Sequence, residues 1–468
     1  MSKKNETTVL LISLAATLAL VVGGVWFGRG MIQPQTQNNA GSKGTNSPTS
    51  NLPIQQRISA GEKNLIPSDE APDKQAGINA IAAKNYTEAV SKLETARKRT
   101  PNDPEILIYL NNARIGNQKS SSIGVSVPIT SDVNGAKEIL RGVAQAQNEI
   151  NLAGGIKGIP LKVLIANDDN VPDVAKQVAE SFVKNSEILG VVGHYSSDVT
   201  LATVNSYQSG QLVAISPIST SVKLSGASSY VFRTVPSDYV AARALADYML
   251  QKLKQKNVAV FFNSQSGYSQ SLKSEFVTAV ALGGGQVISE FDLSSTNFDP
   301  AQNLNQAIKG GAQVIMLASN TDTLDKALQV VQVNDKKLSL LGGDDVYSPK
   351  TLQIGREAAI NMVVAIPWHI LANPKAEFPK AASQLWGAEV NWRTAMAYDA
   401  AKALIAGIER NPTRKGVQQA LSASDFSAEG AAGGIRFLPS GDRNQTVQLV
   451  KIVKGSRTSF GYDFVPVP

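Results

Sequence analysis

The stretch ILGVVGHYSSDVTLATVNSYQSGQLVAISPIST, residues 188–220, contains the pattern that decides the fold. Two short apolar runs, Ile188–Val192 and Leu212–Ile215, flank a helical segment, and each run ends in a group of hydroxyl-bearing residues. Runs of this kind are too short for helices and resemble strands that are buried on both faces of a parallel sheet. The stretch therefore predicts a βαβ unit whose polar residues gather at the carboxyl ends of its strands.

The same alternation of apolar runs and helical stretches continues from Ile123 onward. From Ala136 to Ile150, apolar side chains recur three and four residues apart, which places them on one face of a helix. Strands and helices in alternation build open, doubly wound sheets, and this part of the chain is too long for one sheet. We therefore predict an α/β fold with two doubly wound lobes. The other predicted strands are Ile123–Val127, Leu161–Ala166, Val258–Phe262, Val314–Leu317 and Leu338–Leu341.

The N-terminal segment from Thr7 to Gly28 carries no charge and is long enough to cross a hydrocarbon core as a helix. Lys3 and Lys4 precede it, which favours a cytoplasmic N-terminus. A cleaved signal peptide is the alternative, but Val25–Arg29 is a poor cleavage site. We expect residues 1–30 to be an uncleaved, single-pass anchor in the inner membrane, with the bulk of the chain in the periplasm or outside the cell.

The next two segments differ in composition. Residues 31–70 are rich in Gln, Asn, Ser, Thr, Gly and Pro, which predicts a flexible linker. Residues 71–118 have helical spacing, and Gly77, Ala89 and Ala96 stand at the offsets of a tetratricopeptide repeat. About one and a half repeats are too few for a standard peptide-binding array. The segment is either a short helical spacer or a module that recruits a protein partner.

Composition and missing motifs exclude several classes of function. The chain has no cysteine, which rules out disulfides, thiol catalysis, cysteine metal sites and a lipidated-cysteine anchor. Its net charge of +7 is spread over scattered basic residues and aromatics are only 6%, so we expect no nucleic-acid partner. Neither His194 nor His369 has a partner at metal-ligand spacing, and nucleotide-binding and nucleophile motifs are absent. We therefore expect no catalytic residues, no metal, no cofactor and no enzymatic activity.

Two hydroxyl-rich loops are the first candidate for a ligand site. Gly193–Asp198 follows one predicted strand, and Ser216–Ser221 follows the next. Hydroxyls and free backbone N–H groups at a helix N-terminus bind anions, and the helix dipole adds to the attraction. The alternative is that these hydroxyls only cap their helices. Because both loops end neighbouring strands of one sheet, we expect them to hold a carboxylate together.

Several further short motifs lie along the predicted domain. They are Asn151–Gly158 with Asp168–Asp169, Val192–Ser197, Ile215–Thr220, Phe232–Thr234, Tyr398–Ala400, and Gly434–Phe437 with Gly441–Asp442. Through these motifs the chain from Ile123 to Lys454 resembles the periplasmic branched-chain amino-acid-binding proteins, the type I solute receptors of ABC importers. The resemblance implies capture of an amino acid or similar small zwitterion for an ABC permease. The alternative is a membrane-tethered ligand sensor or scaffold of the same fold, in which the helical segment recruits a protein partner.

The resemblance also implies a domain plan. A binding domain of residues 119–468 would have two lobes joined by three hinge crossings, near Pro236, Val364 and Ile435. The expected lobes are residues 119–236 with 365–435, and residues 237–364 with 436–468.

Carried over by position, the resemblance places the carboxylate of the ligand in the first lobe. Ser197 and Thr220 would offer hydroxyls and backbone N–H groups to that carboxylate. Ile218 and Ser219 would add backbone contacts, including a carbonyl oxygen for the ammonium group of the ligand.

The second lobe would supply the remaining contacts. Tyr268 would close over the ligand, and Asp344 would neutralise its α-ammonium group with a side chain one methylene shorter than the glutamate of leucine-type receptors. Asn320 stands where those receptors have a second tyrosine, which favours a smaller or more polar ligand than a purely aliphatic amino acid. The alternatives are that Tyr268 is a surface turn residue and that Asp344 or Asp345 caps the following helix.

Overall fold

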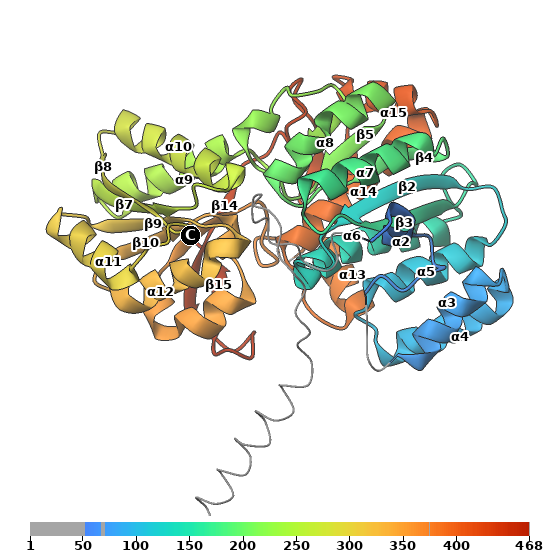
Figure 1. The fold of residues 1–468 in the computed structure, drawn as a ribbon, viewed down its shortest axis with the longest axis horizontal. Coiled ribbons are helices and arrows are strands. Elements are labelled where there is room, and N and C mark those ends of the chain that lie inside the picture. Colours follow the sequence, from blue (N-terminus) through green and yellow to red (C-terminus); the bar gives the residue numbers. More distant parts are fainter. Residues whose placement is uncertain (1–51, 67–70, 374, 468) are drawn as a thin grey trace, which may run out of the picture. The chain divides into compact units, whose positions relative to one another are not determined.

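The computed structural model describes residues 52–66, 71–373 and 375–467, which form two α/β lobes (Figure 1). The anchor predicted at residues 1–30 lies outside these ranges. Within them, no helix combines the length and the apolar character needed to cross a membrane.

The first lobe is built on a six-stranded sheet in the order β1 (Ile58–Ser59), β3 (Leu161–Asn167), β2 (Ser121–Val127), β4 (Ile188–Val192), β5 (Val213–Ser216) and β6 (Val231–Arg233). Its helices are α6 (Val133–Leu152), α7 (Pro172–Lys184), α8 (Ser197–Gly210), α13 (Glu377–Trp386), α14 (Trp392–Arg410) and α15 (Arg414–Ser422). All neighbouring strands are parallel except β1, which runs antiparallel to β3.

Helices cover both faces of this sheet, as the continuous apolar runs predict. Gly124 of β2 lies against Phe182 of α7, whereas Gly190 of β4, which faces the other way, lies against Leu404 of α14. Helix α8 packs beside α7, and α6 packs beside α14. The first sheet is therefore doubly wound and both of its faces are buried.

The second lobe contains a seven-stranded sheet in the order β15 (Tyr462–Pro466), β14 (Gln448–Lys454), β11 (Val363–Ile366), β10 (Ser339–Gly342), β9 (Val314–Ala318), β7 (Asn257–Phe262) and β8 (Gln286–Asp292). Strands β7 to β11 are all parallel to their neighbours. Strands β14 and β15 add an antiparallel edge. Its helices are α9 (Asp238–Asp247), α10 (Gly267–Leu282), α11 (Pro300–Lys309) and α12 (Leu324–Asn334).

The chain crosses between the lobes three times. The first crossing lies between β6 and α9, near Pro236 as predicted. The second follows Ile366, because the whole of β11 belongs to the second sheet. After the hairpin of β12 (Ala428–Gly430) and β13 (Gly433–Ile435), the chain still contacts the first lobe at Asp442, whose carboxylate binds Arg233 at 2.7 Å. The third crossing therefore comes later than Ile435.

Residues 54–66, which we predicted as part of a linker over 31–70, instead belong to the first lobe. Helix α2 (Ile54–Arg57) leads into β1, which pairs with the edge of β3. The Arg57 guanidinium is buried and lies 2.6 Å from the carboxylate of Asp169. An unpaired sheet edge offers backbone groups that a short segment can satisfy, which explains why this polar stretch is folded. Residues 31–51 and 67–70 of the predicted linker lie outside the described residues.

Helices α3 (Pro72–Ala82) and α4 (Tyr86–Arg99) form the predicted all-α hairpin. At Gly77 a Cβ atom would lie 2.6 Å from Cγ of Leu93, so only a glycine allows the two helices to approach this closely.

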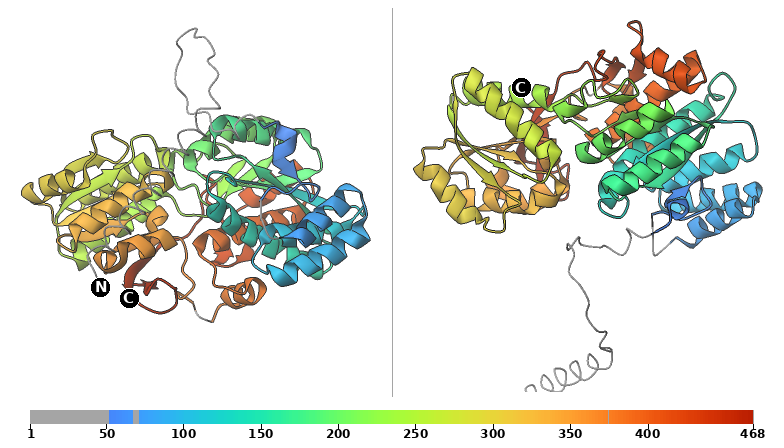
Figure 2. Two further views of the ribbon diagram at one scale, coloured as in Figure 1. Left: turned by 60° about the horizontal axis from the view of Figure 1, so that its bottom comes forward. Right: turned by 45° about the horizontal axis from the view of Figure 1, so that its top comes forward.

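Helix α5 (Pro104–Ile115) is part of the first lobe rather than of a separate spacer. It is buried over nearly its whole length and packs on α6 and β3 (Figure 2). The side chain of Asn112 donates to the carbonyl of Val163 at 2.7 Å and accepts from the N–H of the same residue at 3.1 Å. Its amide thus pairs with β3 as a neighbouring strand would.

Candidate ligand-binding site

The two hydroxyl-rich loops lie side by side at the carboxyl ends of β4 and β5. Ser196 caps α8 by accepting from Val199 N–H at 3.4 Å, and Ser197 is the first residue of that helix. The Oγ of Ser197 accepts from the N–H of Ser221 at 3.2 Å, which joins the two loops. The predicted pairing of the loops is therefore present, and one of the serines also serves the capping role that we kept as the alternative.

The second loop is held by its own serines. Ser216 Oγ donates to the carbonyl of His194 at 2.8 Å and accepts from Ser219 N–H at 3.0 Å. Ser219 Oγ lies 2.8 Å from the hydroxyl of Thr200 on α8. These bonds fix the loop conformation, because the buried backbone groups gain partners.

Tyr268 and Asp344 approach these loops from the second lobe. Tyr268 lies in the first turn of α10, and its hydroxyl donates to Asp344 Oδ1 at 2.5 Å. Asp344 follows β10 directly after Gly343, where a Cβ atom would lie 2.5 Å from the Tyr268 hydroxyl. A glycine before the aspartate is therefore needed for this contact.

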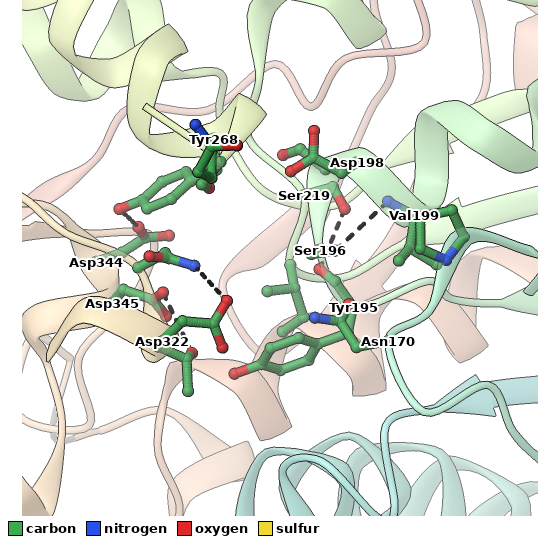
Figure 3. A pocket seen from close by; sticks show the side chains of 17 residues that line it. Asn170, Tyr195, Ser196, Asp198, Val199, Ser219, Tyr268, Asp322, Asp344 and Asp345 are labelled. Atoms are coloured by element: carbon green, nitrogen blue, oxygen red, sulfur yellow. Dashed lines mark hydrogen bonds between the residues drawn. The ribbon is translucent and has the colours of Figure 1, made fainter. Parts of the chain in front are cut away.

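A cavity of about 250 Å³ lies between the two walls and is lined by both lobes (Figure 3). Six of the seven predicted site residues line it: Ser197, Ile218, Ser219, Tyr268, Asn320 and Asp344. Thr220 is buried beside the cavity, in a small recess that it shares with Asp238 and Asp344. Thr220 is therefore not among the residues that line the main cavity.

Two aspartates beside the cavity, Asp344 and Asp238, have raised pKa values. Burial raises the pKa of Asp344 to about 7, and the nearby charge of Asp345 adds to the rise, although the hydrogen bond from Tyr268 opposes it. Burial also raises the pKa of Asp238 to about 6. A nearby cation favours the ionised form of a carboxyl group, so a bound ammonium group would oppose the rise that burial causes.

Several contacts between the lobes lie beside the cavity. Arg393 of α14 lies 3.0 Å from the carboxylate of Asp345 in the second lobe. The Asp198 carboxylate accepts from Gly267 N–H, the first residue of α10, at 2.9 Å. The N–H of Val222 donates to Ser271 Oγ at 3.0 Å. These contacts join the lobes on both sides of the cavity.

Sequence reasoning missed several of these residues. Asp198 follows the serine pair in the quoted stretch, and an acidic residue at the start of a helix was the available signal. Asp322 lines the cavity two residues after Asn320. Arg393 is distant from Asp345 along the chain, and no spacing rule links them.

His194 is a structural residue of the first lobe. Its Nδ1 lies 2.6 Å from Asp168 Oδ2 and its Nε2 lies 2.8 Å from the hydroxyl of Tyr207. The side chain is fully buried and does not line the cavity. Among the described residues, no group of three or more acidic, histidine or cysteine side chains could hold a metal ion.

Comparisons with known proteins point to one family. The sequence profile of the periplasmic binding proteins matches residues 120–457. An "Amino acid binding protein" of Pseudomonas aeruginosa is 34% identical over 152 residues, 32% of this chain and 40% of that protein. A "Leu/Ile/Val-binding protein homolog 3" of Brucella melitensis is 26% identical over 62% of this chain and 78% of its own length.

Solved structures agree in fold. A leucine-binding protein from Thermotoga maritima superposes with a TM-score of 0.64 at 22% identity, over 74% of this chain and 97% of that one. A solute-binding protein from Rhodopseudomonas palustris, in complex with 4-hydroxybenzoate, superposes with a TM-score of 0.65 at 16% identity, over 75% and 96% of the two chains.

Proposed function

Since the chain belongs to the periplasmic binding protein family, we propose that it captures an amino acid or similar small zwitterion outside the cytoplasm for an ABC importer. It is a solute-binding protein rather than an enzyme. The observation that carries the proposal is the cavity between the lobes, with hydroxyls and a helix N-terminus on one wall and Asp344 on the other.

The hydroxyl wall suits a carboxylate. Ser197 Oγ accepts from Ser221 N–H, which leaves its own hydrogen free to donate to a ligand oxygen. The N-terminus of α8 adds backbone N–H groups and the positive end of its dipole. We assign the carboxylate contact to Ser197, because the hydroxyl of Ser219 donates to the carbonyl of Tyr195 at 3.2 Å. Ser219 and Ile218 form the adjoining wall.

The opposite wall suits an ammonium group. Asp344 would gain the counter-charge that it lacks, and Tyr268 would hold its carboxylate in place through the existing hydrogen bond. Because Tyr268 and Asp344 belong to the second lobe, a ligand that bridges both walls would favour the closed arrangement. Closure would bury the ligand and create the surface that a permease reads.

The names of several relatives support this assignment, since they are amino-acid-binding or Leu/Ile/Val-binding proteins. We also propose that the predicted anchor, residues 1–30, holds the binding domain at the outer face of the inner membrane. The binding domain would include residues 54–66 and helix α5 together with residues 119–467, and the tetratricopeptide-like hairpin of α3 and α4 would lie between the first two of these segments. A protein partner for α3 and α4 stays a prediction.

Calorimetric titration of the full chain with individual amino acids tests the proposal. We expect at least one amino acid to bind, and Asp344→Ala to abolish most of that affinity. Asp325→Ala is the matched control, because Asp325 is an exposed residue of α12 that pairs with Lys350 away from the cavity. If no α-amino acid binds, or if Asp344→Ala binds as tightly as the wild type, the proposed function is wrong.

A further inference from the structure

The cavity walls carry a strong excess of negative charge. Four aspartates line the cavity, and the lining contains no lysine, arginine or histidine. Only three of its seventeen lining residues, Pro172, Val199 and Ile218, have apolar aliphatic side chains. The polar groups on most of the lining residues favour a ligand side chain that can replace the hydrogen bonds of displaced water.

Two of the four aspartates are already satisfied within the protein. Asp345 has an ion pair with the buried guanidinium of Arg393. Asp198 accepts from the N–H of Gly267, where the positive end of the α10 dipole also stabilises its charge. These two carboxylates therefore need nothing from a ligand.

The other two aspartates have only neutral partners. Asp344 accepts from the hydroxyl of Tyr268, and Asp322 accepts from the side-chain amide of Asn320 at 3.0 Å. In the described ranges of the chain, neither carboxylate has an ion pair with a basic side chain. Both carboxylates are therefore free to pair with positive charge on a ligand.

The position of Asp322 separates its role from that of Asp344. In Figure 3, Asp322 lies further along the second-lobe wall than Asp344, opposite Tyr195 and Asn170 of the first lobe. Asn170 adds a further acceptor, since its Oδ1 is buried and has no hydrogen-bond partner among the described residues. Asp322 itself is exposed, which places it at the rim, where the end of a side chain would emerge.

We propose that the ligand is an amino acid with a cationic side chain, whose α-ammonium group meets Asp344 and whose side-chain cation meets Asp322. This inference rests on the proposed function, because it takes the carboxylate and ammonium contacts from it. At about 250 Å³ the cavity is smaller than the roughly 300–1,000 Å³ of pockets for drug-sized ligands, which suits a single amino acid. An acidic side chain would face Asp322 without a compensating cation and would be repelled.

Titration of the full chain with lysine, norleucine and cadaverine tests this inference. Norleucine has the carbon chain of lysine without the side-chain ammonium, and cadaverine is lysine without the carboxylate. We expect lysine to bind at least tenfold more tightly than either. In Asp322→Asn the preference for lysine over norleucine should fall to about threefold or less, whereas Asp325→Asn should keep it.

Each other outcome has a defined meaning. Norleucine or leucine binding as tightly as lysine would overturn the cationic side chain and leave the proposed function standing. An unchanged preference in Asp322→Asn would remove the role of Asp322 and overturn the inference as well. Cadaverine binding as tightly as lysine, or no binding of any amino acid, would refute the proposed function together with the inference.

Discussion

Replacing Asp344 with asparagine should stabilise the ligand-free protein above pH 7 while it weakens ligand binding. The pKa of this carboxyl group is about 7 in the folded chain and 3.8 in its ordinary state. The folded state therefore holds a proton that the unfolded state releases, so the unfolding free energy falls as the pH rises from about 4 to about 7. An asparagine carries no such penalty and can still accept the hydrogen bond from Tyr268.

The magnitude follows from the pKa difference. A difference of about three units corresponds to about 4 kcal/mol at about 1.4 kcal/mol per unit. Because the carboxyl group is partly exposed to the cavity, water screens part of this penalty, and we expect about 2 kcal/mol at pH 8. At pH 4 the substitution should be nearly neutral, because Asp344 is then protonated in the folded state and about half protonated in the unfolded one.

Urea titrations of the full chain at pH 4 and pH 8 would measure the effect. Asp325→Asn should change the unfolding free energy by less than about 0.5 kcal/mol at either pH, because its carboxylate is exposed. Calorimetry should show a loss of about 2–4 kcal/mol in binding for Asp344→Asn, since the ammonium group of the ligand would be buried without a counter-charge. Equal destabilisation at both pH values would refute the reasoning, because it would mean that Asp344 is ionised and satisfied in the absence of ligand.

Three further substitutions test other contacts. Tyr268→Phe should cost about 1–2 kcal/mol in affinity, mainly through a faster off-rate in stopped-flow measurements. An unchanged off-rate would contradict a role for the hydrogen bond from Tyr268 to Asp344. Arg393→Met should weaken binding by about 2 kcal/mol or more by calorimetry, because closure would bury Asp345 unpaired. Arg57→Ala should lower the unfolding free energy by about 3 kcal/mol in urea without changing ligand affinity, and a loss of affinity would speak against this separation.

Seven strands of the two lobes were predictable because their interiors are continuous apolar runs. All seven predicted runs coincide with strands, from β2 to β10. Strands β6, β8, β11, β14 and β15 were not predicted. In β8 only one of seven residues is fully buried, so its pattern is weak, whereas the buried apolar run of β11 was a signal that we missed. The two-residue strand β1 has no pattern at all, because its pairing depends on the free edge of β3.

The burial of helix α5 was not predicted, although its sequence contains a signal for it. Helix α5 has the sequence PEILIYLNNARI, which is apolar around most of its circumference, and such a helix is usually buried on all sides. That signal was available and predicts packing against a larger body. We instead expected a separable helical segment, because the tetratricopeptide-repeat offsets lie in α3 and α4 and we grouped α5 with them.

The parts of the site that follow from the order of strands along the chain were predictable. The contacts that form between the two lobes were not. The hydroxyl loops end consecutive strands, so their meeting follows from the rule for parallel sheets. Thr220 belongs to the same loop as Ser219 but lies in the neighbouring recess, where its carbonyl accepts from the N–H of Asp238 at 2.8 Å. The pair of Arg393 and Asp345 forms between lobes, and no local pattern in either segment records it.

The attachment of β1 to the first sheet determines how a mechanical load would enter the molecule. The strand order runs from β1 at one edge to β6 at the other, and the chain leaves for the second lobe after β6. Tension applied to the chain ahead of Leu52 would therefore act on β1 and the ion pair of Arg57 with Asp169, at the edge farthest from the first hinge crossing. Under the proposed anchoring, such tension would load the two-residue pairing of β1 with β3 before it reached the hinge crossing after β6.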